Sequence, residues 1–362
     1  MKSFHFLFYT SSHGLGHSTR MIEVANNIPS CHKVTFATCA PEWIYRSSMT
    51  RPYSYRMVKI DTGVIQNDFL TVCEEETLRD YSDLLKHREK IIKEEVTWNK
   101  INKVDLIISD IPPMAFPVAK NLSVPSIGIA NFSWDWIYRP MVKNYPAYSH
   151  VIESIQKDYK QADLVLSLPV NGDMSVFPCV KPIALIARKS RLSGKEIRQK
   201  LNIDEKKKLI LCSFSNFSMV KIDFSHVSEE LKDFILISFN SEFPGNYNNF
   251  IKLDNCGNIS HEEAVAAADI VVCKPGYGMV AETIVNKTHV LYTSRKDYIE
   301  NKILAEGLHQ YGIAEEISNE DFLSGKWSAP IKKLMSCNKK WENIDCSGAK
   351  IAADEIFKLL QR

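Results

Sequence analysis

Two histidines flank a glycine turn near the start of the chain. The run 11–20, SSHGLGHSTR, follows an apolar segment and holds His13 and His17 around Gly14 and Gly16. The glycines permit a tight turn, and the helix start that follows offers N–H groups to an anion. An imidazole there can accept a proton near neutral pH, whereas a dinucleotide fingerprint is excluded because its third small residue is missing. The alternative is that His17 only caps or packs the helix start.

Asp110 stands in a second motif, SDIPP, which also follows an apolar segment. A carboxylate at this position can orient a histidine and stabilise its charged form. The alternative is an N-cap for the helix expected after the two prolines. Closeness to His17 across the edge of a sheet would favour the first interpretation.

A second glycine turn lies in the run 274–282, KPGYGMVAE. Gly276 and Gly278 would expose backbone N–H groups at a helix start, which suits a diphosphate. Glu282 follows Gly278 by four residues, so it shares a helix face with the turn and can accept hydrogen bonds from a ribose diol. The alternative is a surface glutamate on an ordinary turn.

Two further segments can bind phosphate. Arg295, in the charged run 294–301, is a candidate phosphate ligand, although such a run is also typical of a solvated helix start. Ser215 and Asn216, in the run 214–218, can donate hydrogen bonds to the same phosphates or form a plain turn.

The run Asn131–Tyr138, NFSWDWIY, combines aromatic rings with polar groups. Trp134 and Asp135 would line an acceptor wall, because aromatic faces stack on sugars. Packing of these rings in a core is the alternative. We expect loops in 61–103 and 131–145 to select the acceptor.

Apolar runs alternate with amphipathic stretches, which predicts a parallel sheet with helices on both faces in each half of the chain. The expected strands are 4–10, 33–39, 106–109, 126–130, 164–168, 209–214, 234–238, 270–273 and 289–292. The expected helices are 19–27, 75–101, 148–161, 261–268, 280–286, 298–307 and 347–360.

The predicted fold is α/β, with two Rossmann-like, doubly wound domains facing a cleft. The domains span 1–185 and 186–345, joined by a proline-containing linker in 169–191, and the segment 346–362 contains a C-terminal helix. Ligands of open parallel sheets lie beyond the carboxyl ends of the strands, where all the motifs above occur.

Composition supports a packed globular chain. Its 362 residues are 45% hydrophobic and 24% charged with a net charge of +2, so no basic excess indicates nucleic acid. Nine cysteines without a CxxC pair favour reduced thiols over disulfides or zinc. Neither a signal peptide nor a spanning segment is evident, so we expect a cytoplasmic location, with peripheral membrane contact left open.

Taken together, HGLGHSTR, PGYGMVAET and the later pair Glu300–Asn301 resemble the GT-B glycosyltransferases. The peptidoglycan N-acetylglucosaminyltransferase is one similar member. The glycosyltransferase-like N-terminal region of plant arabinokinase is similar also at SDIPP, NFSWDWIY and RKDY, so the resemblance covers nearly the whole chain.

The resemblance implies an acceptor-binding first domain and a second domain that binds a nucleotide-sugar. It also implies that the C-terminal helix in 346–362 packs back on the first domain. It makes His17 the base for the acceptor hydroxyl and Asp110 its partner. It assigns the diphosphate to the turn Gly276, Tyr277, Gly278 and Met279, and the ribose to Glu282. Glu300 and Asn301 replace the usual Asp-Gln pair that reads donor hydroxyls, so the donor sugar does not carry over.

The implied reaction is inverting transfer of a hexosyl or N-acetylhexosaminyl group from a nucleotide-sugar, with a UDP-sugar favoured. It needs no cofactor and no obligatory metal. Two alternatives remain: a nucleotide-sugar 2-epimerase, which needs extra carboxylates such as Asp61, Asp68 or Asp135, and a non-catalytic nucleotide-sugar-binding module. The sequence indicates neither the acceptor nor an oligomeric state.

Overall fold

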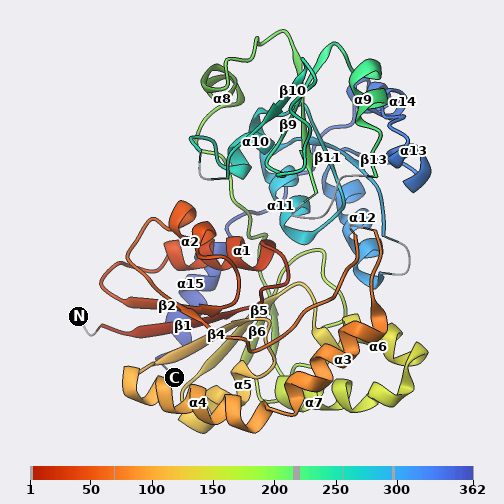
Figure 1. The fold of residues 1–362 in the computed structure, drawn as a ribbon. Helices are drawn as coiled ribbons and strands as arrows, with labels where there is room; N and C mark the ends of the chain where they lie inside the picture. Colours follow the sequence, from red (N-terminus) through yellow and green to blue (C-terminus); the bar gives the residue numbers. More distant parts are fainter. Residues whose placement is uncertain (1–2, 69, 215–220, 256, 296–297, 362) are drawn as a thin grey trace. The chain divides into compact units, whose positions relative to one another are not determined.

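The chain forms two compact units, drawn in Figure 1. The computed structural model describes residues 3–68, 70–214, 221–255, 257–295 and 298–361. Unit 1 comprises Met1–Ile65, Val72–Ala187 and Asp345–Arg362, and unit 2 comprises Gln66–Thr71 and Arg188–Ile344.

Unit 1 is built on a seven-stranded parallel sheet in the order β3-β2-β1-β4-β5-β6-β7. Its strands are β1 (His5–Thr10), β2 (Lys33–Thr38), β3 (Ser54–Met57), β4 (Leu106–Asp110), β5 (Ser126–Ala130), β6 (Leu164–Ser167) and β7 (Val180–Pro182). All residues of β1, β4, β5 and β6 are buried, as expected for strands covered on both faces.

The helices of unit 1 connect these strands. They are α1 (Gly16–Asn26), α2 (Glu42–Ser48), α3 (Glu74–Leu85), α4 (Arg88–Asn102), α5 (Ala115–Leu122), α6 (Trp134–Asn144), η1 (Pro146–Tyr148), α7 (Ser149–Tyr159) and α15 (Gly348–Leu359). The violet-blue α15 in Figure 1 comes from the end of the chain and packs against α1. Its Phe357 ring contacts the rings of Phe6 and His32, and the backbone of Gly348 closely approaches that of Ala184.

Unit 2 is built on a six-stranded parallel sheet in the order β10-β9-β8-β11-β12-β13. Its strands are β8 (Lys208–Ser213), β9 (Phe234–Ser238), β10 (Phe250–Lys252), β11 (Ile270–Cys273), β12 (His289–Tyr292) and β13 (Ala314–Glu316). Its helices are α8 (Gly194–Lys200), α9 (Phe224–Glu230), α10 (His261–Ala267), α11 (Tyr277–Asn286), α12 (Ile299–Tyr311), α13 (Asn319–Leu323) and α14 (Ser328–Met335).

Each unit has its own core. In unit 1, Leu7 and Tyr9 of β1 pack with Met114 and Val118 beside the sheet. In unit 2, aromatic residues that include Trp327 pack with the strand residues of β8 and β11. The predicted α/β fold with two doubly wound parallel sheets is therefore confirmed.

Both sheets have the same connectivity, because the first strand of each unit lies between the second and the fourth. The connections reverse direction between β1 and β4 in unit 1, and between β8 and β11 in unit 2. Such a switch point leaves a crevice at the carboxyl ends of the two central strands, where ligands of doubly wound sheets bind.

The structure differs from the sequence prediction in several connections. The segment 131–145, expected to hold an acceptor loop, is largely helical because it contains α6. The helix expected over 75–101 is two helices that meet at Lys86–His87. Among the described residues, no helix has both the length and the apolar character needed to cross a bilayer.

Candidate functional site

The switch point of unit 1 brings His17 and Asp110 together. Asp110 ends β4 in register with Thr10 of β1, and His17 lies in the first turn of α1, directly after the glycine turn. The Nδ1 atom of His17 is 2.9 Å from Oδ1 of Asp110. Asp110 caps no helix, because α5 begins at Ala115 without a side-chain cap. The structure thus fits the histidine-partner interpretation of Asp110 rather than the capping one.

Arg20 joins this pair from the next turn of α1. Its Nε and Nη2 donate to the two carboxylate oxygens of Asp110, and its Nη1 donates to Oδ1 of Asn131 over 2.7 Å. Arg20 is only 4% exposed. The guanidinium therefore holds the carboxylate with a two-point fork inside the fold, which fixes the geometry that His17 meets.

These contacts assign the proton of the His17 ring. Nδ1 lies 3.0 Å from Nη2 of Arg20 as well as 2.9 Å from the Asp110 carboxylate. An arginine has only donors and a carboxylate only acceptors, and a bond from Nδ1–H to the carboxylate is charge-assisted. We place the proton on Nδ1, so Nε2 carries the lone pair. Within the described part of the chain, Nε2 has no hydrogen-bond partner.

The charges at this switch point keep Asp110 ionised. Burial alone would raise the pKa of this carboxyl, but the Arg20 and His17 side chains outweigh burial and lower the pKa below its ordinary value. An ionised carboxylate beside an imidazole is the arrangement of an acid partner with a general base.

Aromatic rings surround the His17 imidazole. The Phe132 ring meets it edge-on at 5.6 Å between centroids, and the Trp134 ring lies at 6.4 Å. Trp134 is 0% exposed and stacks on Tyr138, so its ring packs in the core. The structure thus places Trp134 in the core beside the imidazole, not on an open face.

Two buried carboxylates lie near the predicted acceptor residues. Asp61 accepts a hydrogen bond from Nε1 of Trp134 over 3.2 Å, and burial raises its pKa. Asp135 lies in the first turn of α6 and accepts a bond from Gln156 over 3.2 Å. Asp68, the third carboxylate considered for an epimerase, belongs to unit 2.

The glycine turn has a structural role that the sequence predicts. Gly14 has φ +74°, which glycine adopts without strain, and Gly16 opens α1. His13 accepts a hydrogen bond at Nδ1 from the backbone of Val64 over 3.2 Å. The chain after β3 passes so close that a side chain at Gly63 would collide with His13.

In unit 2, the second glycine turn begins α11 beside the other switch point. Gly276 is the N-cap residue in extended backbone, and among the described residues no side chain caps this helix start. A Cβ atom added at Gly276 would meet no atom within 4 Å. The protein's own packing therefore does not require glycine there, and the open space suits a ligand that approaches the N-terminus of α11, where Tyr277, Gly278 and Met279 form the first turn.

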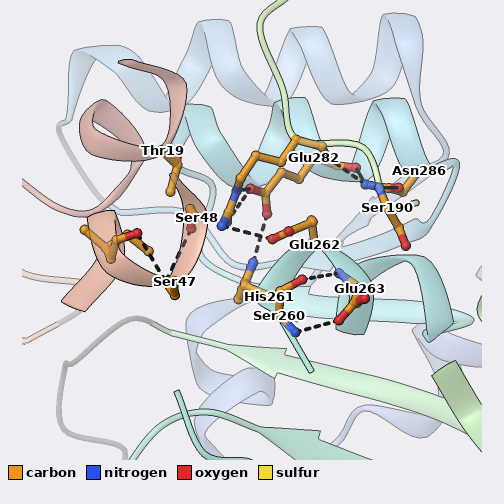
Figure 2. A network of polar contacts seen from close by, with 12 residues as sticks. Thr19, Ser47, Ser48, Ser190, Ser260, His261, Glu262, Glu263, Glu282 and Asn286 are labelled. Atoms are coloured by element: carbon orange, nitrogen blue, oxygen red, sulfur yellow. Dashed lines mark hydrogen bonds and ion pairs between the residues drawn. The ribbon is translucent and has the colours of Figure 1, made fainter. Parts of the chain in front are cut away.

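Glu282 lies on the second turn of α11 and is buried within a polar network, shown in Figure 2. Its Oε1 accepts a bond from Nε of Arg188 over 2.6 Å, and its Oε2 lies 2.8 Å from Nδ1 of His261. Arg188 also pairs with Glu262 over 2.9 Å. Burial would raise the pKa of Glu282, but Arg188 and His261 lower it, so Glu282 is an ionised carboxylate held from two sides.

Charged groups gather after β11 and β12. Burial, reinforced by Arg295, lowers the pKa of Lys274 well below its ordinary value, and Glu300 acts in the opposite direction. The Arg295 guanidinium lies over the Tyr298 ring at 3.7 Å, and the amide of Asn301 donates to the Arg295 carbonyl over 2.6 Å. The side chains of Arg295, Glu300 and Asn301 are all buried.

Two predicted donor ligands, Ser215 and Asn216, lie outside the described residues. In the described part of the chain, no three histidine, cysteine, aspartate or glutamate side chains are grouped so that they could hold a metal ion.

Arg20, Arg188 and His261 contact the candidate site residues but were not predicted from the sequence. A signal for Arg20 was available, because it follows His17 by three residues and so shares its helix face. Arg188 and His261 are 94 and 21 residues from Glu282, and no local pattern links them to it.

Comparison with known proteins gives one curated relative. No protein-family model matches the chain. The chain is 30% identical over 353 residues to L-arabinokinase of Arabidopsis thaliana, which covers 96% of this chain and 34% of that protein. It thus spans about a third of the length of the relative it matches.

Solved glycosyltransferases share the fold. The glycotransferase of kitacinnamycin is 14% identical with a TM-score of 0.62, covering 100% of this chain and 96% of that chain. A UDP-glucosyltransferase from Polygonum tinctorium is 14% identical with a TM-score of 0.61, and the match covers 100% of this chain and 99% of that chain. UGT2 of Phytolacca americana is 14% identical with a TM-score of 0.59, and the match covers 99% of this chain and 94% of that chain. The resemblance that the motifs predict is confirmed at the level of architecture, and the chain has the GT-B fold.

Proposed function

We propose that the chain is a glycosyltransferase that moves a sugar from a nucleoside-diphosphate sugar to an acceptor hydroxyl. The observation that carries this proposal is the arrangement at His17. Asp110 and Arg20 fix the imidazole with Nδ1 protonated, so Nε2 is the basic nitrogen. A base of this kind at the carboxyl edge of a doubly wound sheet suits proton removal from a bound hydroxyl.

The reaction follows from these groups. The acceptor oxygen attacks the anomeric carbon of the donor while its proton passes to Nε2 of His17. The bond between the anomeric carbon and the diphosphate oxygen breaks, and the electron pair leaves with the nucleoside diphosphate. Asp110 stabilises the imidazolium that forms. A single displacement of this kind inverts the configuration at the anomeric carbon.

Unit 2 supplies what the leaving diphosphate needs. The uncapped start of α11 offers backbone N–H groups and the positive end of a helix dipole, and Gly276 leaves room for the ligand. Arg295, whose charge acts on Lys274 two residues before Gly276, adds positive charge close by. We propose that these groups stabilise the negative charge of the departing diphosphate without a metal ion. Glu282 faces the ribose hydroxyls in this proposal.

Two of the structural neighbours support a nucleotide-sugar donor. One is a UDP-glucosyltransferase, and the Phytolacca UGT2 structure contains UDP-2-fluoro-glucose and pterostilbene. We therefore favour a UDP-sugar as donor and a hexosyl or N-acetylhexosaminyl group as the group transferred.

A non-catalytic nucleotide-sugar-binding module is the second candidate. The curated relative is named a kinase, and this chain matches only 34% of it. A region that accompanies another activity can serve to sense a ligand. Binding of a nucleotide-sugar without transfer to any acceptor would favour this candidate.

The first experiment is a thermal-shift panel of UDP-, GDP-, ADP- and dTDP-sugars with the free nucleoside diphosphates. Ligand at about 100 times its Kd stabilises a fold by about 2.7 kcal/mol, which is several degrees in Tm. We expect one nucleotide class to give this shift, and Glu282→Gln to reduce it. Glu229→Gln, at an exposed position of α9, is the matched control. No shift with any member of the panel would refute nucleotide-sugar binding.

A further inference from the structure

A chain of hydrogen bonds in unit 2 runs from the sheet to the buried carboxylate of α11. Oγ of Ser213, at the end of β8, lies 3.0 Å from Nε2 of His261. Nδ1 of the same ring lies 2.8 Å from Oε2 of Glu282, and Arg188 holds the other oxygen of that carboxylate. Figure 2 shows His261, the first residue of α10, aimed at Glu282.

The proton positions along this chain follow from its two ends. Glu282 is ionised and only accepts, so Nδ1 of His261 carries a proton and donates to it. When the ring is neutral, Nε2 is an acceptor, and the Ser213 hydroxyl must donate to it. When the ring is charged, Nε2–H donates to Oγ, and the Ser213 proton becomes available to another acceptor.

Ser213 lies where such an acceptor is expected. It pairs in register with Cys273 of β11, and the three residues after Cys273 lead into the uncapped start of α11. Ser213 and His261 are partly exposed, whereas Glu282 is buried. The Ser213 hydroxyl is therefore at the partly exposed end of this series of hydrogen bonds, at the switch point of the unit 2 sheet.

We propose that His261 is a positioning residue of the donor site, which holds Glu282 in place and, when charged, turns the Ser213 hydroxyl into a donor for a phosphate oxygen of the nucleotide. This inference rests on the proposed function, because it takes the diphosphate to bind at the start of α11. It adds Ser213 as a phosphate contact and makes nucleotide affinity depend on the charge of one ring.

In the interval from pH 6 to pH 8, the ionised Glu282 and three other groups face His261. Glu282 from α11 is ionised and paired with Arg188, which precedes α8. Glu262, the next residue on α10, also pairs with Arg188. Phe239, after β9, contributes a ring 5.7 Å away and no charge. A histidine is the side chain that ordinarily changes charge in this interval.

The test is nucleotide affinity as a function of pH. Isothermal titration at pH 6, 7 and 8 would use UDP-glucose, GDP-mannose, ADP-glucose and dTDP-glucose, whose diphosphates do not titrate in this range. A charge-assisted hydrogen bond in place of a neutral one is worth about fivefold in affinity. For the wild type, we expect about fivefold tighter binding at pH 6 than at pH 8, because affinity falls as the ring loses its proton.

Two variants and one control separate positioning from general stability. In His261→Asn, the amide nitrogen replaces Nδ1 and can still donate to Glu282, but it does not titrate. Ser213→Ala removes the proposed phosphate donor. We expect both to bind at pH 8 within about threefold of the wild type and to lose most of the gain at pH 6. His226→Asn, at a partly exposed histidine of α9, should leave the pH profile unchanged.

The outcomes distinguish this inference from the proposed function. If the wild type binds a nucleotide-sugar but lacks the pH dependence, or if either variant retains it in full, the role of His261 is wrong while the donor site stands. If the wild type binds none of the four at any pH, the proposed function fails and this inference fails with it. Circular dichroism at each pH verifies that the variants are folded.

Discussion

Replacing Arg20 by methionine tests the arrangement at His17 through stability. Arg20 is the buried cation that donates to both oxygens of Asp110. Methionine fills similar space but leaves the Asp110 carboxylate with only the His17 ring. Removing one partner of a buried ion pair costs about 3–5 kcal/mol, because the remaining charge has no compensation. For a domain of about 150–250 residues this lowers the melting temperature by about 6–20 °C.

The assay is differential scanning calorimetry of Arg20→Met beside a matched control in the same unit. Arg46 on α2 pairs with Glu42, but the Arg46 side chain is 73% exposed. Such surface pairs contribute about 0.3–0.5 kcal/mol, so Arg46→Met should change the melting temperature by about 2 °C at most.

A double variant isolates the charge interaction. With Asp110→Asn, the group left behind by Arg20→Met is neutral, so the two changes together should cost less than the sum of the single changes by over about 1 kcal/mol. Strict additivity, or equal effects of Arg20→Met and Arg46→Met, would refute the claim that Arg20 compensates a buried carboxylate.

Three further predictions concern unit 1. The pKa of Asp110 is lowered by folding, so its contribution to stability is present above about pH 4 and lost as the pH falls further; in urea unfolding, the deficit of Asp110→Asn at pH 7 should shrink toward pH 3. The pKa of Asp61 is raised, so burial of its charge opposes folding above that value; Asp61→Asn should become more stable relative to the wild type as the pH rises from 4 to 7, and an unchanging difference would contradict this. A Cβ at Gly348 would lie 2.2 Å from the Ala184 carbonyl oxygen, so Gly348→Ala should loosen α15 and speed proteolysis of the C-terminal segment, whereas Gly245→Ala, which meets no atom within 4 Å, should not.

The central strands were predictable from sequence, and the edge strands were not. The central strands of both sheets appear in the sequence as apolar runs, because both faces of these strands are buried. They are β2, β1, β4, β5 and β6 in unit 1 and β9, β8, β11 and β12 in unit 2. The four strands without an apolar run are the sheet edges, which are short and largely exposed: Ser54–Met57, Val180–Pro182, Phe250–Lys252 and Ala314–Glu316.

The candidate site was predictable one element at a time. His17 and Asp110 each followed a predicted strand, but only the pairing of Thr10 with Asp110 in the sheet determines that they meet. A cap and a histidine partner look alike in sequence, because both call for an aspartate after a strand. Arg188 and His261 contact Glu282 from distant positions in the chain, so these contacts could be recognised only from the folded structure.

The most direct test of glycosyl transfer is release of nucleoside diphosphate in the presence of an acceptor library, with wild type and His17→Gln compared. The donor would be the nucleotide-sugar selected by thermal shift, and the library would contain monosaccharides, glycolipids and phenols. We expect acceptor-dependent release by the wild type and a rate about 10²–10⁴ times lower for His17→Gln, with donor affinity unchanged. Equal rates for the two proteins, or tight donor binding without release for any acceptor, would contradict the assignment of His17 as the base of a glycosyltransferase.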